Sequence, residues 1–558
     1  MRRDKGSSNI DSAMRNIRHL TLLGCAFTFL YGWASASAKP NIVIVMADDM
    51  GYSDIGCYGG EIRTSNVDRL AENGLRFTQF YNAGRCCPTR ASLLTGLYAH
   101  QTGIGHMTSE NERQNFDLGY PGYRGYLNQS CVTIAEALKP AGYKTLMTGK
   151  WHIGTFEGMW PVDRGFDRYY GIIRGASNFF RPAPEKLLVH NRERIVPGED
   201  YYTTDAFTSE AIKFVREAER DDSQPFFLYL AYTAPHWPLH AWPEDVQKYR
   251  RRYMIGWDRV REARLERMRA MGLIDDAWEM TVRDAVPWGT LSAAKKDEMD
   301  LRMAIYAAQI HRMDQNIGKF VDTLRDLGEL DDTLFFFLAD NGGCAEGGML
   351  GRGPIEILMT KKGYSQSYGQ AWANTSNTPF RKYKHWVHEG GIASPLVVHW
   401  PAGISAQGEL RTQPTHLIDL MATALDVGEA GYPKEFGGNK ILPLEGVSMM
   451  PAFEGRAIDR EALYWEHEGN RAVRRGRWKL VAENRGPWEL YDMDADRTET
   501  NDVMAIHPEI GREMIEMYTV WAMARDVLPG RPRRKPGYTP PERQYPETAD
   551  YEPLATTP

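Results

Sequence analysis

The chain of 558 residues is too long for one small domain and has the length of one large domain with a smaller one. Apolar residues make up 42% and charged residues 25%, as in ordinary soluble globular proteins. With a net charge of −6, the chain has no overall electrostatic attraction for nucleic acid or an anionic membrane. An anionic substrate would therefore have to be bound by local cations.

The N-terminal segment 1–38 has the pattern of a secretory signal peptide. Arg15 and Arg18 precede an apolar run that ends in the small-residue stretch ASASA, and cleavage after Ala38 would fit an A-x-A site. A start at Met14 would bring the signal to about 25 residues, within the usual range. The apolar run is too short to span a bilayer. We therefore expect an exported protein, periplasmic or secreted, without stable membrane insertion.

Several apolar runs end abruptly in polar or charged residues, which predicts strands buried on both faces. Between them lie helical patterns, of which 303–324 is the clearest because its apolar residues recur three and four apart. Strands that alternate with helices predict an α/β fold with a large, mostly parallel mixed sheet sandwiched by helices. The expected strands lie at 41–49, 144–152, 226–236, 333–342 and 394–401.

Near residue 460 the pattern changes to short alternating segments separated by turn residues, followed by a helical stretch at 507–526. This predicts a small antiparallel sheet packed with one helix. The last residues are rich in proline and charge, which indicates an irregular tail. The predicted organisation is a signal peptide (1–38), a catalytic domain (39–455), a C-terminal α+β subdomain (456–530) and a tail (531–558).

Polar residues follow or precede the expected strands. Ligands in open α/β sheets bind at the carboxyl ends of the strands, so these residues should meet at one edge. Each alone has a plain explanation, since an aspartate at a strand end usually forms a turn and a lone histidine or lysine is usually solvated. Together they are hard to explain by chance. The set is Asp48, Asp49, Lys150, His152, His236, Asp340, Asn341, Lys384 and His388.

The oxygen donors in this set suit a hard divalent cation. Asp48, Asp49, Asp340 and Asn341 offer carboxylate and amide oxygens, and flexible coordination by such donors favours Ca²⁺. Mg²⁺ is less suited because it prefers strict octahedral geometry and keeps several waters. The lysines and histidines would then bind an oxyanion and move protons.

The segment RCCPTRASLLTG (85–96) holds two of the few cysteines in the chain. Pro88 suits the first turn of a helix, so we expect Cys86 just before a helix N-terminus, where backbone N–H groups favour an anion or thiolate. Arg90, on the first turn, could steady both the nucleophile and the metal-binding carboxylates. The plain alternative is two partly buried cysteines at a helix start, since adjacent cysteines rarely bridge each other.

From these residues the chain resembles the type I sulfatases of the alkaline phosphatase superfamily, and within them the arylsulfatases. The C-x-P-x-R signature of that family matches 86–90. Further blocks match in the same order: NIVIVMADDMGYSDIGCYGG, GKWHIG, APHWP, ADNGG and a lysine five residues before EGG. The resemblance extends from Pro40 to about Leu528. Thr89 replaces the commoner serine, and Leu97 stands where an arginine often ends the extended signature.

The resemblance implies a role for each matching residue. Cys86 would be oxidised to formylglycine by a maturation enzyme and become the nucleophile. The remaining implied roles are Ca²⁺ binding by Asp48, Asp49, Asp340, Asn341 and the modified Cys86, stabilisation of the formylglycine by Arg90, sulfate binding by Lys150, Lys384 and His236, and proton transfer by His152 and His236.

The reaction implied by the resemblance is hydrolysis of an aryl sulfate or sulfated carbohydrate to alcohol and inorganic sulfate. Formylglycine hydrates to a geminal diol, of which one hydroxyl attacks sulfur and the second expels sulfate from the covalent enzyme. We expect His152 to act as base in that second step. His236, helped by Lys384, would protonate the leaving alcohol.

Three alternatives stay open on the sequence alone. The chain could be a phosphonate monoester or phosphodiester hydrolase of the same superfamily, a non-catalytic binder of sulfated glycans, or an enzyme left inactive because Cys86 is not matured. The pocket wall is expected in segments 105–130, 174–200 and 344–378. There Tyr364, Tyr368 and Trp372 could stack on an aryl ring or a sugar, although such aromatics pack locally as often.

Overall fold

Strand β1 (Asn41–Ala47) lies inside a large sheet because both of its faces are apolar. Val43 and Val45 pack into one hydrophobic core, whereas Ile42 and Ile44 pack into a second core on the opposite face. Side chains alternate between the two faces of a strand, so this run supplies both layers at once. The burial on both faces explains why the segment is continuously hydrophobic rather than alternating.

The computed structural model describes residues 39–108, 116–220 and 224–541. The predicted signal peptide and most of the predicted tail lie outside these residues, and the described part of the tail has neither helix nor strand. The division of the mature chain at residue 455 stays a prediction. In the described ranges, every helix is too short or too polar to cross a bilayer.

The large sheet contains eleven strands in the order β10-β2-β9-β8-β1-β7-β3-β4-β5-β6, with β11 beside β2. The five expected strands are confirmed as β1, β3, β7, β8 and β9. The other bounds are β2 (Leu75–Tyr81), β3 (Lys144–Lys150), β4 (Arg168–Ile172), β5 (Leu188–His190), β6 (Glu193–Arg194), β7 (Phe226–Ala231), β8 (Thr333–Ala339), β9 (Ala393–His399), β10 (Glu409–Arg411) and β11 (Thr415–His416).

Strand β9 runs antiparallel to both of its neighbours, β8 and β2. The central strands β8, β1, β7 and β3 are parallel to one another. The beginning of β9, rather than its end, therefore lies at the carboxyl edge of the central strands. This is why Lys384, which precedes β9, reaches the same edge as the residues that follow β1, β3, β7 and β8.

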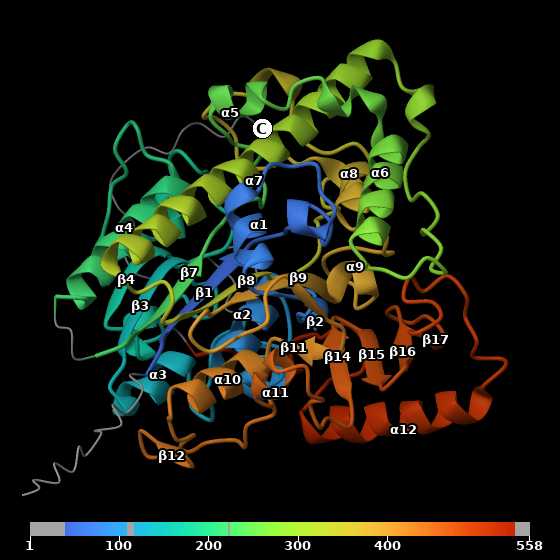
Figure 1. Cartoon of the computed structure of the whole chain (residues 1–558). Helices are drawn as coiled ribbons and strands as arrows, with labels where there is room; N and C mark the ends of the chain where they lie inside the picture. Colours follow the sequence, from blue (N-terminus) through green and yellow to red (C-terminus); the bar gives the residue numbers. More distant parts are fainter. Residues whose placement is uncertain (1–38, 109–115, 221–223, 542–558) are drawn as a thin grey trace, which may run out of the picture. The chain divides into compact units, whose positions relative to one another are not determined.

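Helices cover both faces of the sheet, as predicted (Figure 1). The long helix predicted around 303–324 is confirmed and extends further, as α7 (Ala293–Leu327). It shares the first core with α1 (Ser65–Glu72), α4 (Thr203–Ala218), α5 (Pro243–Gln247), α6 (Trp257–Ala270), α8 (Gly369–Ser376) and α9 (Glu389–Ile392). The second core holds α2 (Cys86–Thr95), α3 (Ile134–Leu138), α10 (Asp419–Val427) and α11 (Met450–Phe453).

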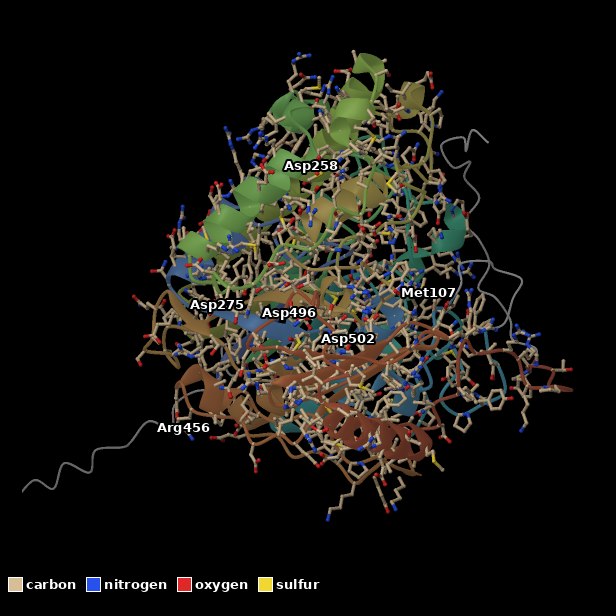
Figure 2. The ribbon with its side chains drawn as sticks, turned by 90° about the vertical axis from the view of Figure 1, so that its right-hand side faces the viewer. Met107, Asp258, Asp275, Arg456, Asp496 and Asp502 are labelled. Atoms are coloured by element: carbon tan, nitrogen blue, oxygen red, sulfur yellow. The ribbon has the colours of Figure 1, made fainter. Side chains whose placement is uncertain are left out.

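The C-terminal part forms the predicted small antiparallel sheet with one helix, and the sheet has four strands in the described residues. The strands are β14 (Leu463–His467), β15 (Asn470–Arg475), β16 (Trp478–Ala482) and β17 (Glu489–Asp492), and the helix is α12 (Pro508–Ala524). Figure 2 views the molecule from the side on which this sheet lies, with Asp496 and Asp502 labelled in the segment that follows β17. A separate two-stranded hairpin pairs β12 (Glu435–Phe436) with β13 (Asn439–Lys440).

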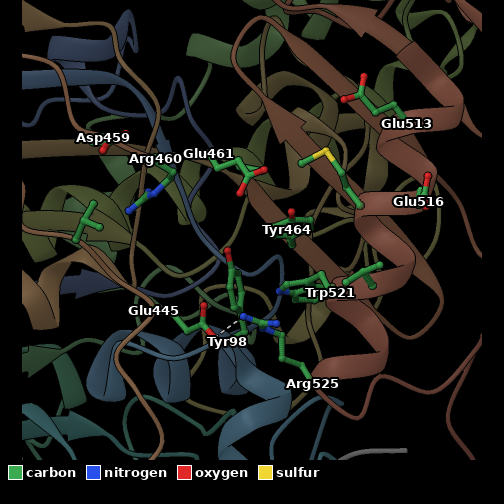
Figure 3. A pocket seen from close by; sticks show the side chains of 14 residues that line it. Tyr98, Glu445, Asp459, Arg460, Glu461, Tyr464, Glu513, Glu516, Trp521 and Arg525 are labelled. Carbon is green, nitrogen blue, oxygen red and sulfur yellow. Dashed lines mark hydrogen bonds and ion pairs between the residues drawn. The ribbon is translucent and has the colours of Figure 1, made fainter. Parts of the chain in front are cut away.

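A pocket of about 600 Å³ lies along helix α12 (Figure 3). Tyr464 and Trp521 stack in it with their ring centroids 5.1 Å apart, and Arg525 pairs with Glu445 at 2.7 Å. The residues that line this pocket include none of the predicted site residues. It is therefore separate from the site described below.

A fully buried ion network joins the C-terminal sheet to the large sheet. Glu389 contacts Lys479 of β16 at 2.8 Å and Arg497 at 2.9 Å, and Lys479 contacts Glu499 at 2.8 Å. All four side chains have 0% exposure. Burial raises the pKa of Glu389, but Lys479 and Arg497 outweigh it and lower this pKa to about 2. The carboxylate therefore stays ionised inside the protein.

We predict that Lys479→Met destabilises the fold by about 3–5 kcal/mol, because it leaves two buried carboxylates without their shared cation. Urea unfolding followed by fluorescence measures the change. Lys139→Met is the matched control, since Lys139 forms an exposed ion pair with Asp167 and its loss should cost at most about 1 kcal/mol. Equal midpoints for the two variants would contradict the stabilising role of the network.

Candidate active site

The four predicted oxygen donors meet at the carboxyl edge of β1 and β8. Asp48 and Asp49 follow β1, and Asp340 and Asn341 follow the neighbouring β8. The backbone N–H of Asp49 donates to Oδ1 of Asp340 at 3.0 Å, and Nδ2 of Asn341 donates to Oδ1 of Asp49 at 2.7 Å. All four residues are buried. The pairing of the two strands thus brings the donors together.

This cluster has the chemistry of a site for a hard cation. Oδ1 of Asp48 and Oδ1 of Asn341 are buried and accept no hydrogen bond from the described residues, although Nη2 of Arg90 lies 3.6 Å from Oδ1 of Asp48. Burial, together with the charge of Asp48, raises the pKa of Asp340 to about 8 although Arg90 opposes this, so the ionised form of Asp340 is disfavoured. Buried oxygens without a hydrogen bond and a carboxylate whose ionised form is disfavoured are what a Ca²⁺ or Mg²⁺ ion would satisfy.

Each carboxylate also contacts a buried cation from a different element. Nζ of Lys150, at the end of β3, lies 2.7 Å from Oδ2 of Asp48. Nζ of Lys384 lies 2.8 Å from Oδ2 of Asp49. Nη2 of Arg90, on α2, lies 2.9 Å from Oδ2 of Asp340. All three predicted cations therefore reach the cluster.

Cys86 lies against the same cluster, fully buried. Its Sγ and carboxylate oxygens of Asp48 and Asp340 all lie within 4.8 Å of one another. Helix α2 begins at Cys86 itself, with Arg85 as the N-cap, rather than after it as expected. Burial raises the pKa of Cys86 to about 12 although Lys150 and Lys384 oppose this, so a thiolate of the unmodified side chain is disfavoured despite its place at a helix start.

Cys87 points elsewhere. Its Sγ accepts a hydrogen bond from the backbone N–H of Thr108 at 3.3 Å and lies 3.5 Å from Sδ of Met107. It belongs to the second hydrophobic core together with Ala91 and Leu94 of the same helix. The cysteines of the described residues are all free, so the adjacent pair forms no disulfide.

Two of the three candidate histidines lie at the site. Nδ1 of His236 donates to the carbonyl of Trp237 at 2.6 Å, which leaves Nε2 to face Nζ of Lys384 at 3.2 Å. Nδ1 of His152 is buried without a partner. Burial lowers the pKa of both histidines, and Lys150 lowers that of His152 further. His388 instead lies 3.5 Å from Glu489 of the C-terminal sheet.

Glu346 is a site residue that the sequence patterns do not single out. Its carboxylate contacts Nη2 of Arg85 at 3.0 Å and accepts a hydrogen bond from Nε1 of Trp237 at 2.9 Å. Burial raises the pKa of Glu346, but Lys384 and Arg85 outweigh it and hold the pKa below its usual value. The only sequence signal was its place in 344–378, a segment expected to form the pocket wall.

The three aromatic candidates for substrate stacking differ in burial and in location. Trp372 is fully buried, and Tyr368 is buried with its ring stacked on Tyr306, centroids 4.4 Å apart. Both therefore pack locally. Tyr364 is half-buried and its ring meets Trp237 edge to face at 5.9 Å. Tyr364 therefore lies beside Trp237, which adjoins the site.

Comparison with known proteins agrees with this geometry. Residues 40–430 match the sulfatase family, and residues 380–517 match the family described as N-sulphoglucosamine sulphohydrolase, C-terminal. An uncharacterised sulfatase of Schizosaccharomyces pombe is 34% identical over 88% of this chain and 95% of its own length.

An arylsulfatase of Klebsiella aerogenes is 32% identical over 77% of this chain and 95% of its own length. The crystal structure of Ps i-CgsB in complex with k-i-k-neocarrahexaose is 26% identical, with a TM-score of 0.66 over 88% of this chain and 95% of that chain. The family match spans most of the chain, and the relatives align along nearly their whole length. The chain therefore belongs to the type I sulfatases of the alkaline phosphatase superfamily and is a sulfatase.

Proposed function

We propose that this sulfatase hydrolyses its sulfate ester with a formylglycine formed from Cys86 and a bound Ca²⁺ ion. The observation that carries the proposal is the position of Cys86 within 4.8 Å of two metal-ligand candidates, Asp48 and Asp340. Lys150 contributes a second cation at the same place, 2.7 Å from Asp48. A nucleophile beside a metal site and beside cations is the arrangement that attack on an anionic ester needs.

The metal would be held by Asp48, Asp49, Asp340, Asn341 and the modified side chain at position 86. Bound there, Ca²⁺ supplies positive charge that polarises a sulfate oxygen and activates the nucleophile. The orphan oxygens of Asp48 and Asn341 support this assignment. Ca²⁺ is proposed over Mg²⁺ because the donors are oxygens on the two loops that follow β1 and β8, which suits flexible coordination.

Formylglycine at position 86 supplies, as its hydrate, one hydroxyl for the attack and a second through which sulfate can leave. Arg90 would hold this side chain and the carboxylates in place, since it already bridges Asp340 and the carbonyl of Lys150, at 2.9 and 3.0 Å. The C-x-P-x-R signature also supports the proposal, because it selects Cys86 and leaves Cys87 as its variable position.

The remaining residues would bind the sulfate and transfer protons. Lys150 and Lys384 would bind sulfate oxygens. His152 would accept a proton when sulfate leaves, and its buried, unpartnered Nδ1 is free to do so. His236 would pass a proton to the leaving alcohol, with Lys384 3.2 Å from its Nε2 as the source.

The proposed substrate is an aryl sulfate or a sulfated carbohydrate. The arylsulfatase relative supports the first, and the sugar bound to Ps i-CgsB supports the second. The half-buried Tyr364 and Trp237 offer aromatic surface for either leaving group. We also propose that the enzyme is exported after cleavage at Ala38, because the first residues match a signal peptide.

We predict that Cys86→Ser lowers kcat by about 10³-fold or more, because a serine lacks the second hydroxyl that expels sulfate. Cys87→Ala should keep most of the activity. Mass spectrometry of the tryptic peptide should show the aldehyde, with a mass below that of the cysteine peptide, in the wild type and Cys87→Ala only. An aldehyde that persists in Cys86→Ser would contradict the assignment.

We expect chelation to abolish activity and Ca²⁺ to restore it better than Mg²⁺. Asp48→Asn should lower activity by more than the ~10–100-fold typical of changes behind the ligands, because it removes the negative charge and one oxygen of a direct ligand. Calorimetry should show weaker Ca²⁺ binding for this variant. Asp167→Asn, a remote exposed aspartate that pairs with Lys139, is the control and should bind Ca²⁺ like the wild type. Full activity after chelation would refute the metal role.

A substrate panel tests the reaction class directly. We expect 4-nitrophenyl sulfate and sulfated oligosaccharides to be turned over with a higher kcat/KM than aryl phosphate diesters or phosphonate monoesters. Release of inorganic sulfate measures turnover of the sulfate esters, and release of the alcohol or phenol measures turnover of the phosphorus esters. Higher kcat/KM for the phosphorus esters would favour the phosphonate hydrolase alternative, and binding of sulfated glycans without turnover by matured protein would favour the non-catalytic binder.

A further inference from the structure

A second group of metal-ligating side chains lies outside the site just described. His385 precedes β9, His467 ends β14, and Glu468 begins the turn that leads into β15. One donor atom from each of the three residues lies within 4.8 Å of the other two. The group joins the segment that carries Lys384 to the tip of the β14–β15 hairpin.

His467 is the residue in this group whose surroundings indicate that it binds a ligand. Its side chain has 0% exposure, yet neither ring nitrogen has a hydrogen-bond partner among the described residues. Buried side-chain nitrogens in native proteins nearly always have one, so two orphan nitrogens on one ring need an explanation. Burial lowers the pKa of both His467 and His385, which keeps the imidazoles in the neutral form that binds metals.

Hydrogen bonds hold the segment of His385 and the β14–β15 hairpin in fixed positions. Nδ2 of Asn470 donates to the carbonyl of His467 at 3.1 Å and to the carbonyl of His385 at 3.3 Å, so one buried side chain ties both segments. The N–H of His385 donates to the carbonyl of Gly84 at 2.7 Å. Glu468 and Gly469 have φ of 49° and 94°, as a tight two-residue hairpin turn requires.

The neighbouring cations do not prevent a metal from binding. Arg531 lies 3.2 Å from Glu468, but its side chain is 73% exposed, so this pair is weak and easily displaced. Arg85 is held by Glu346 at 3.0 Å. His100, which also lies near His467, has its own partner in Glu466 at 2.7 Å.

We propose that His385, His467 and Glu468 bind a divalent transition metal, with Zn²⁺ as the representative ion. Two imidazoles and one carboxylate are a donor set that Zn²⁺ accepts readily, whereas Ca²⁺ needs more oxygen ligands. Zinc–ligand distances of about 2.0–2.2 Å require the donors to draw closer, which the half-buried His385 and Glu468 side chains can do by changing rotamer. The metal would clamp the hairpin to the segment that carries Lys384.

The test uses untagged full-length protein stripped with chelator and then dialysed into excess Ca²⁺, so that the oxygen-rich site is filled. We expect calorimetry to show one equivalent of Zn²⁺ bound, and Co²⁺ to give the visible absorption of a four- or five-coordinate ion. Bound Zn²⁺ should also raise the midpoint of thermal unfolding. Absence of Zn²⁺ binding in the presence of Ca²⁺ would overturn the proposal.

His385→Ala and Glu468→Gln should each weaken Zn²⁺ binding at least tenfold and remove the Co²⁺ bands, and both positions are half-buried, so folding should survive. His467→Ala should do the same if it folds. His507→Ala is the matched control, since His507 also lies near a glutamate, Glu509 at 3.7 Å, but without a third donor, and it should bind Zn²⁺ like the wild type. Unchanged Zn²⁺ binding in both His385→Ala and Glu468→Gln would overturn the zinc proposal. Ca²⁺ binding and sulfate release test the proposed function separately and do not affect this result.

Discussion

The charge buried at the carboxyl edge of the central sheet is the constraint on which the rest of the structure depends. Asp48, Asp49 and Asp340 are all held out of water. Burying an unpaired carboxylate is costly, so each contacts a cation, and these come from α2, the end of β3 and the segment before β9. No two of the cations are neighbours in sequence. The site therefore exists only when the sheet is complete, and the fold and the chemistry are assembled together.

The same constraint explains why the C-terminal sheet is attached where it is. Lys384 must be held at the cluster although it lies on a loop. Five residues later, Glu389 is fixed by Lys479 of the C-terminal sheet and by Arg497, and its N–H donates to Glu499 at 2.9 Å. Both ends of the segment 384–389 are therefore anchored by ion pairs, one to the active site and one to the small sheet. The four-stranded sheet therefore supports the segment that carries Lys384.

The sequence was sufficient to predict the central strands and the residues that meet at their edge, because burial on both faces and abrupt polar ends are local signals. It could not show that β9 is antiparallel, since direction depends on pairing with distant strands. His388 has the same local setting as Lys384 but faces Glu489. Trp372 was an aromatic in a presumed loop and turned out to be in the core. In each case the deciding partner is far away in the chain.

Cys86 and Cys87 are adjacent in sequence at this edge, but their side chains face different surroundings. Successive residues of a helix point about 100° apart, so one of two adjacent cysteines can face the charges while the next faces the core. Cys86 faces Asp48, Asp340 and the lysines, whereas Cys87 packs against Met107. Burial disfavours a thiolate at either position, because it raises the pKa of both thiols. Orientation rather than thiol acidity therefore separates them, and in the proposed function the residue placed among the charges would act as nucleophile after conversion to a different functional group.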